Sequence, residues 1–240
     1  MSKLIRLIEK LAGQRLLLEL MITPLFPLSN VVLFPKTPIP IHIFEEHHQA
    51  MIRDAMAGDR ELTFVLLRNE MESESEYAGF ENMHEVACLG RIEACDEFED
   101  GHYDIVVVGI RRVRIIRTTR HFPYLMAEVE ALPEFDYDDY PDVLADRHGR
   151  ISGLFSRFVR LATDGSCEAG EIIPKMDFES LVNTIAMTLN ITTEQKQGLL
   201  EMDDAFQRCD ILSAILQQQI ETLGIIRRFE YLKPENPHFN

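Results

Sequence analysis

Three histidines and two glutamates fall within seven residues, in the order His42, Glu45, Glu46, His47 and His48. Imidazole and carboxylate are common ligands for transition metals. No second histidine or acid lies four residues from His48, and neighbouring residues of a helix point in different directions. We therefore interpret these histidines as surface groups and expect no metal. A metal-dependent hydrolase that uses His47 and His48 is the weakest functional hypothesis.

Other catalytic motifs are missing from the sequence. None of the 12 glycines falls in a GxxxxGK[ST] phosphate-binding loop, no GxGxxG follows an expected strand, and no GxSxG is present. The acidic pairs Asp138-Asp139 and Asp203-Asp204 are neighbours on an expected linker and helix cap, where carboxylates are usually solvated. The sequence thus predicts no catalytic residue and no cofactor.

A basic cluster runs against the acidic balance of the chain. Five arginines lie within ten residues: Arg111, Arg112, Arg114, Arg117 and Arg120. On a strand they alternate between two faces, so a solvated sheet rim that pairs with nearby glutamates is favoured over an RNA-contacting patch. The net charge of −16 also disfavours nucleic acid and anionic lipid. RNA binding through Arg111, Arg112, Arg114 and Arg117 is kept as the alternative function.

Apolar side chains at expected loop ends are the remaining candidates. They are Phe26, Phe34, Phe44, Tyr77, Phe80, Met83 and Phe98. Most must fill a sheet core. Those that share an exposed surface would form a groove for unfolded or extended peptide. Five of them form the predicted peptide-binding set: Phe26, Phe34, Phe44, Met83 and Phe98.

From Thr23 to Pro133 the pattern predicts a sheet, because short β-branched runs are bounded by Pro, Gly and acidic residues. One helix interrupts it, Glu45 to Ala57, with Gly58 as its stop. A hairpin is expected at Glu99-Asp100-Gly101. The candidate strands are Val31 to Phe34, Ile39 to Phe44, Leu62 to Leu67, Val86 to Ala94, Tyr103 to Val108, Val113 to Thr118 and Tyr124 to Ala131.

After this sheet, residues 134–146 are rich in acid and contain no Lys or Arg, which predicts a solvated connection and a domain boundary. Residues 147–232 show helical spacing and two caps, at Thr192 and Asp204, with a final long helix from Ala205. Residues 233–240 form an expected tail. Residues 1–22 are predicted as an amphipathic extension, with an over-long start of the chain as the alternative.

The cysteines are Cys88, Cys95, Cys167 and Cys209, and their spacing suggests neither a disulfide framework nor a zinc site. No apolar run approaches the roughly 18 residues of a membrane span. We expect reduced thiols, no membrane partner and a cytoplasmic protein.

Ordered motifs along the chain resemble the Lon protease amino-terminal domain family. They are Pro24-Leu25-Phe26-Pro27-Leu28, Val31-Val32-Leu33-Phe34-Pro35, Ile39-Pro40-Ile41-His42-Ile43-Phe44-Glu45, Asp54-Ala55-Met56-Ala57-Gly58, Leu89-Gly90-Arg91-Ile92, Asp100-Gly101 and Gly109-Ile110-Arg111-Arg112-Val113-Arg114. Later matches are Glu194-Gln195-Lys196-Gln197, Leu199-Leu200-Glu201 and Arg208.

This resemblance implies an α+β fold, with an amino-terminal β-rich pseudo-barrel similar to PUA-like domains followed by a carboxy-terminal α-helical bundle. It also implies a stand-alone module for binding unfolded or degron-bearing polypeptides, without the ATPase and peptidase of Lon. Such a module would act as an adaptor or regulator in protein quality control, with a protease as a further partner. The bound protein and the oligomeric state are left open.

Overall fold

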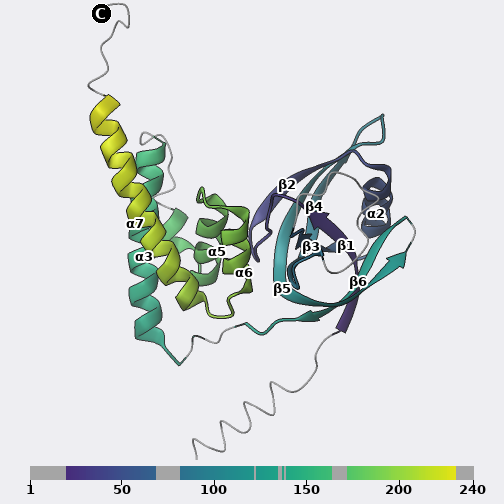
Figure 1. The fold of residues 1–240 in the computed structure, drawn as a ribbon, viewed down its shortest axis with the longest axis horizontal. Coiled ribbons are helices and arrows are strands. Elements are labelled where there is room, and N and C mark those ends of the chain that lie inside the picture. Colours follow the sequence, from purple (N-terminus) through teal and green to yellow (C-terminus); the bar gives the residue numbers. More distant parts are fainter. Residues whose placement is uncertain are drawn as a thin grey trace, which may run out of the picture. The chain divides into compact units, whose positions relative to one another are not determined.

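The computed structural model describes residues 20–68, 82–121, 123–134, 137, 139–163 and 172–230, without the side chains of residues 120, 121, 229 and 230. The chain divides into two compact units, Met1–Pro133 and Glu134–Asn240. Among the described residues, the first unit is a sheet with one helix and the second is helical (Figure 1). The predicted α+β fold is therefore confirmed.

The first unit is a mixed barrel. Its strands are β1 (Leu20–Leu28), β2 (Pro38–Ile43), β3 (Glu61–Leu66), β4 (Val86–Glu97), β5 (Tyr103–His121) and β6 (Tyr124–Ala131). They are ordered β2-β5-β4-β3-β1-β6, and a further pairing of β5 with β6 closes the sheet into a barrel. β1 and β3 are parallel, whereas the other pairs are antiparallel. The predicted pseudo-barrel is thus present.

One long strand, β5, makes this closure possible. The two strands predicted at 103–108 and 113–118 are parts of it, and it pairs with β2, β4 and β6. Register shifts lie between Leu89 and Gly90 on β4 and between Ile115 and Arg117 on β5. Such bulges bend a strand and increase its twist, so β5 can follow the barrel wall.

The first strand, β1, was not predicted. Pro24 and Pro27 lack the N–H of a ladder, and prolines argue against a central strand. The structure nevertheless pairs Leu20 to Leu25 with β6 and Leu25 to Leu28 with β3. The expected extension over residues 1–22 is therefore wrong at its end, because residues 20–22 belong to the barrel. Residues 1–19 lie outside the described residues.

The strand predicted at Val31 to Phe34 is also wrong. Residues 31–34 belong to no strand, although Val32, Leu33 and Phe34 are buried. The segment instead brings its backbone against β5, where Lys36 N donates to Gly109 O at 2.7 Å and Gly109 N donates to Thr37 O at 3.1 Å. Val32, Leu33 and Phe34 therefore contribute side chains to the barrel core and are not part of a strand ladder.

The edge strand β2 carries two prolines, Pro38 and Pro40. The carbonyl of Thr37 points toward β5, where it accepts from Gly109. Because backbone groups alternate along a strand, Pro38 and Pro40 fall on the opposite side, away from β5. The outward side of β2 thus lacks two N–H donors.

Helix α2 (Glu46–Ala57) packs on β1 and β6 and confirms the predicted helix. It buries Met51, Ile52 and Ala55. Gly58 ends the helix, donating its N–H to Ala55 O. A hydrogen bond of 2.7 Å from the Tyr124 hydroxyl to Asp54 Oδ2 ties the helix to β6.

The helical unit contains α3 (Pro141–Ala162), a 3-10 turn η3 (Ile173–Lys175), α5 (Phe178–Thr188), α6 (Thr193–Glu201) and α7 (Ala205–Glu230). The helix α3 packs along α7 (Figure 1). Its start shortens the acidic connection expected over residues 134–146. The first turn contains Pro141 and Asp142, both favourable at a helix start. Backbone N–H groups in the first turn have no partner within the helix, so the missing N–H of proline costs no hydrogen bond. The carboxylate of Asp142 is stabilised by the positive end of the helix dipole.

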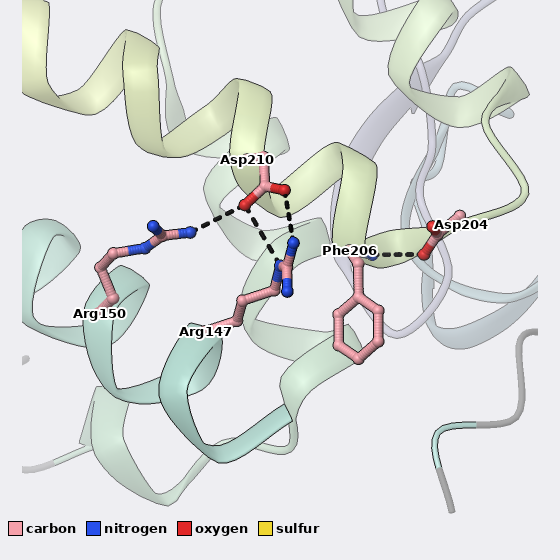
Figure 2. Close-up of polar contacts among 5 residues, drawn as sticks. All are labelled: Arg147, Arg150, Asp204, Phe206 and Asp210. Atoms are coloured by element: carbon pink, nitrogen blue, oxygen red, sulfur yellow. Dashed lines mark hydrogen bonds and ion pairs between the residues drawn. The ribbon is translucent and has the colours of Figure 1, made fainter. Parts of the chain in front are cut away.

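Two predicted helix caps are present in this unit. Thr192 and Gln195 form a reciprocal capping box at α6. Asp204 Oδ1 accepts a hydrogen bond of 2.8 Å from Phe206 N at the start of α7 (Figure 2). The caps satisfy backbone donors that a helix start leaves without a partner.

Both cores are mainly apolar and bury a few polar groups. The barrel core is built from apolar strand residues, among them Leu25, Leu89 and Val129. The helical core also buries Arg208, whose Nη1 donates to Oδ1 of the buried Asn183 at 2.8 Å. The described residues contain no helix with both the length and the apolar character needed to cross a membrane.

Candidate functional site

Two of the five residues in the predicted peptide-binding set are exposed, and both lie at one end of the barrel. The pairings place Ile43 of β2 beside Tyr103 of β5, and Tyr103 beside Glu97 of β4. Phe44 follows Ile43 and Phe98 follows Glu97, with side chains 60% and 47% exposed. Since adjacent strands are about 5 Å apart, the two phenylalanines leave the sheet roughly 10 Å from each other.

Two histidines extend this aromatic surface. The His42 ring stacks near Phe44, with 6.4 Å between centroids, and meets His102 edge-on at 5.7 Å. His42 Nδ1 lies 2.5 Å from Asp104 Oδ1, and His102 Nδ1 lies 3.2 Å from Asp100 Oδ2. We call His42, Phe44, Phe98 and His102 the barrel-end surface.

Backbone contacts hold the barrel-end surface in place. Gln49 Nε2 on α2 donates to Phe44 O at 3.0 Å, which fixes the turn between β2 and α2. In the β4–β5 hairpin, Phe98 N donates to His102 O at 2.9 Å, and Gly101 adopts a φ of 87°. This positive φ is the conformation that glycine adopts without strain, and it confirms the turn predicted at Gly101.

The other three residues of the set are buried. Phe26, Phe34 and Met83 are at most 4% exposed and belong to the barrel core. Their burial removes them from any surface that a polypeptide could contact in this conformation, so the expectation narrows to Phe44 and Phe98. Tyr77 and Phe80 lie outside the described residues.

The four arginines of the possible basic patch do not form one surface. Arg112 is buried and its Nη2 donates to Pro133 O at 3.1 Å. Arg117 Nε donates to Glu128 Oε2 at 2.5 Å, and Arg114 is paired in register with Glu130. Arg111 is half-buried. Pairing with acids across the strands, together with the net charge of −16, does not favour RNA binding.

The interpretation of His47 and His48 as surface groups is wrong for His48. Its ring is buried and stacks on Phe26, with 4.3 Å between the ring centroids. Burial, and then the neighbouring His47, lower the pKa of His48 to about 3. The sequence argument considered only neighbours along the helix, whereas His48 packs against Phe26 of β1.

A concave surface lies on the barrel wall and was missed by the sequence reasoning. Tyr124, Met126 and Glu128 of β6 line it together with Arg117 and Ile22. Ile22 is 72% exposed. No sequence pattern indicated this surface, because the strand that carries Ile22 was not predicted.

The helical unit carries a partly exposed ion cluster between α3 and α7. Arg147 donates through Nε and Nη2 to both oxygens of Asp210, at 3.2 and 2.8 Å, and Arg150 donates to Asp210 Oδ1 at 2.8 Å (Figure 2). The Arg147 guanidinium also lies 4.9 Å from the centre of the Phe206 ring. These contacts join α3 to α7, so we assign them to packing.

Solved structures place this architecture in a known class, the Lon amino-terminal domains. The amino-terminal domain of the Mycobacterium avium complex Lon protease matches with a TM-score of 0.63 and 19% identity, over 82% of this chain and 98% of that one. A Lon amino-terminal domain protein from Xanthomonas campestris matches with a TM-score of 0.58 and 22% identity, over 81% of this chain and 98% of that one. At these identities the likeness concerns the fold.

The sequence comparison is more specific. The model of the ATP-dependent protease La (LON) substrate-binding domain matches residues 22–218, and the chain belongs to this family. The resemblance predicted from the motifs is thereby confirmed. Among curated relatives, Lon protease 2 of Herpetosiphon aurantiacus is 29% identical over 203 residues, which cover 84% of this chain and 24% of that protein. Lon protease of Desulfosudis oleivorans is 28% identical over 203 residues, again covering 24% of its length. The chain thus spans about a quarter of the length of these relatives.

Proposed function

We propose that this chain is a non-catalytic module that binds unfolded or degron-bearing polypeptides. The single observation that carries the proposal is its membership of the LON substrate-binding domain family over residues 22–218. The family description supports a role in substrate recognition. That the ligand is a polypeptide, and that it binds at the barrel-end surface, is our own inference.

The barrel-end surface is the place where such a polypeptide would bind. Phe44 and Phe98 offer exposed rings at one end of the barrel, held by hydrogen-bonded turns. Aromatic rings supply large apolar contact area at low conformational-entropy cost, and they dominate many binding surfaces. The histidines and aspartates around them provide polar partners for the backbone of an extended chain.

Binding by strand addition is disfavoured at the neighbouring edge. An added strand needs free N–H and C=O groups along the edge strand. Pro38 and Pro40 remove two donors from the outward side of β2. We therefore propose recognition through side chains and not through a backbone ladder.

The cellular role that follows is delivery of damaged polypeptides for degradation in the cytoplasm, as an adaptor or regulator in protein quality control. A protease is the expected partner. The free thiols of Cys88, Cys95 and Cys209 are consistent with a reducing compartment. Crosslinking in living cells, followed by mass spectrometry, should recover both a protease and peptides from unfolded proteins at the barrel-end surface.

Fluorescence anisotropy with a labelled, chemically unfolded model protein tests the binding surface. A Phe44→Ser, Phe98→Ser double variant should bind about tenfold more weakly, because loss of one aromatic anchor commonly costs more than about 1 kcal/mol. Ile225→Ser is the matched control, since Ile225 is an exposed apolar residue of α7 (55% exposed).

Three results would count against the proposal. Wild-type protein that shows no saturable binding refutes polypeptide recognition. A double variant that binds like the wild type refutes the barrel-end surface. If instead Ile22→Ser weakens binding, the concave surface beside β6 is the binding surface.

A further inference from the structure

Glu45, His47 and His48 bring one carboxylate oxygen and two imidazole nitrogens together at the start of α2. Glu45 Oε2 lies 2.8 Å from His48 Nδ1 and 3.4 Å from His47 Nε2. One ligand atom from each residue lies within 4.8 Å of the other two. In the part of the chain that the structure describes, no other group of three or more His, Cys, Asp or Glu residues converges in this way.

These separations are close to those of a metal site. Tetrahedral coordination with bonds of roughly 2.0 to 2.2 Å places ligand atoms about 3.4 Å apart. The separation of Glu45 Oε2 and His47 Nε2 already has this value. The separation of Glu45 Oε2 and His48 Nδ1 must widen by about 0.6 Å, which a small side-chain rotation supplies. Two separations are thus within about 0.6 Å of a tetrahedral edge, and one ligand atom of each residue lies within 4.8 Å of the other two.

The position of Glu45 is unusual for a helix cap. It is the N-cap residue of α2, yet its side chain makes no capping hydrogen bond. Acidic N-cap residues commonly accept an amide hydrogen of the first turn. Here the carboxylate is directed to the two imidazoles, and its Oε2 atom is buried. The local fold therefore forgoes one helix cap and places an anionic oxygen between two nitrogen donors.

The histidines are held in place before any ligand arrives. The His48 ring contacts Phe26 at 4.3 Å and His47 at 4.0 Å between centroids. Its lowered pKa, about 3, keeps the imidazole neutral, which is the form that ligates metals. Glu45 Oε2 itself is buried, but the side chains of Glu45 and His47 are 24% and 25% exposed, so the cluster lies near the protein surface. A preoriented donor set lowers the cost of binding.

Packing alone accounts for the burial of His48 against Phe26, but it gives no reason for His47 and Glu45 to converge on the same point. From this convergence we propose that Glu45, His47 and His48 bind one divalent transition metal ion of the zinc class, with solvent completing the coordination. Imidazole nitrogen favours zinc and its neighbours over calcium and magnesium, which prefer all-oxygen sites. The site is independent of the proposed polypeptide binding. It replaces the sequence-based expectation that no metal is bound.

Isothermal titration of the chelator-treated full chain with zinc chloride alone tests the site, and Co²⁺ serves as a spectroscopic probe of tetrahedral coordination. We expect saturable uptake of one equivalent. Glu45→Gln and His47→Asn should each weaken the affinity at least tenfold, because each removes one of three ligands. Both side chains are partly exposed, so these variants avoid the buried stack of His48 on Phe26. Far-UV circular dichroism checks that they fold.

A His42→Asn, His102→Asn double variant is the matched control, since it removes two exposed imidazoles that lie beside acids elsewhere on the same barrel. It should bind zinc as the wild type does. The proposal is overturned if the wild type shows no saturable binding, if folded Glu45→Gln and His47→Asn variants bind as well as the wild type, or if the control loses the ion.

Discussion

Two strand glycines of the barrel and the described helix glycines of the other unit lie in opposite surroundings. A Cβ atom on Gly109 of β5 would be 2.1 Å from Phe34 O, and one on Gly90 of β4 would be 2.7 Å from Val107 Cγ1. In the helical unit a Cβ would meet nothing within 4 Å at Gly149, Gly153, Gly198 or Gly224. At the two strand positions glycine is required because backbone or core atoms press against it, whereas the helices carry glycine at a cost in helix stability. The same substitution should therefore have opposite effects in the two units.

The largest expected effect is that of Gly109→Ala. The new methyl group would collide with the backbone of Phe34 and Pro35, and the segment that donates Lys36 N to Gly109 O would have to move. We expect a loss of about 3 kcal/mol in the free energy of unfolding. Hydrogen exchange followed by mass spectrometry should show faster exchange in β2 and β5 and unchanged exchange in α7.

Gly153→Ala in α3 is the matched control for this prediction. It should stabilise the helical unit by about 0.5 to 1 kcal/mol, because alanine is the better helix former and the site is open. Equal effects of the two substitutions, in sign and size, would contradict the contrast between the units.

A smaller loss is expected from the buried polar pair of the helical core. Asn183→Leu removes the acceptor of the Arg208 Nη1 hydrogen bond and leaves a buried guanidinium with one partner fewer. We expect a destabilisation of about 2 to 3 kcal/mol, measured by urea unfolding followed at the helical circular dichroism signal. An Asn183→Leu, Arg208→Met double variant should recover part of this loss, because the charge itself is gone. If Asn183→Leu leaves the free energy of unfolding unchanged, the Asn183–Arg208 pair does not stabilise the core.

The smallest effect belongs to the ion cluster on Asp210. The hydrogen bond from Arg147 holds the pKa of Asp210 below its ordinary value, so the folded state favours the carboxylate. The Asp210 carboxylate therefore stabilises the folded state at pH values above its unfolded pKa of about 3.9. This stabilisation is lost as the pH falls through the lower pKa that Asp210 has in the folded state. Because Asp210 is partly exposed, we expect Asp210→Asn to cost less than about 1 kcal/mol at neutral pH. Unfolding curves of the two proteins should converge below about pH 4, and a constant difference down to pH 2 would contradict this cause.

Local patterns predicted most of the elements. The run from Tyr124 to Ala131, the helix ending at Ala57 and the capping box at Thr192 follow from alternation, stop residues and cap chemistry, all of which act over a few neighbours. The fold class came from the ordered motifs of the family. In the candidate site, the exposure of Phe44 and Phe98 agrees with their places beside strand ends.

What could not be predicted depends on contacts between distant residues. β1 is a strand despite Pro24 and Pro27 because β3 and β6 supply partners for its other residues. Phe26, Phe34 and Phe44 each follow an aliphatic residue, and the packing of the folded barrel decides which of the three rings is exposed. The convergence of Glu45, His47 and His48 likewise depends on Phe26, which lies about twenty residues earlier in the chain.

The prolines of β2 have a consequence for the protein in a crowded cell. Unfolded chains expose segments that pair with any free strand edge, and such pairing can grow into aggregates. A module that binds unfolded chains, as we propose for this one, would meet these segments continually. Because Pro38 and Pro40 present no donors on the outward side, β2 is a poor template for them, and the barrel should neither seed nor join an amyloid-like assembly through this edge.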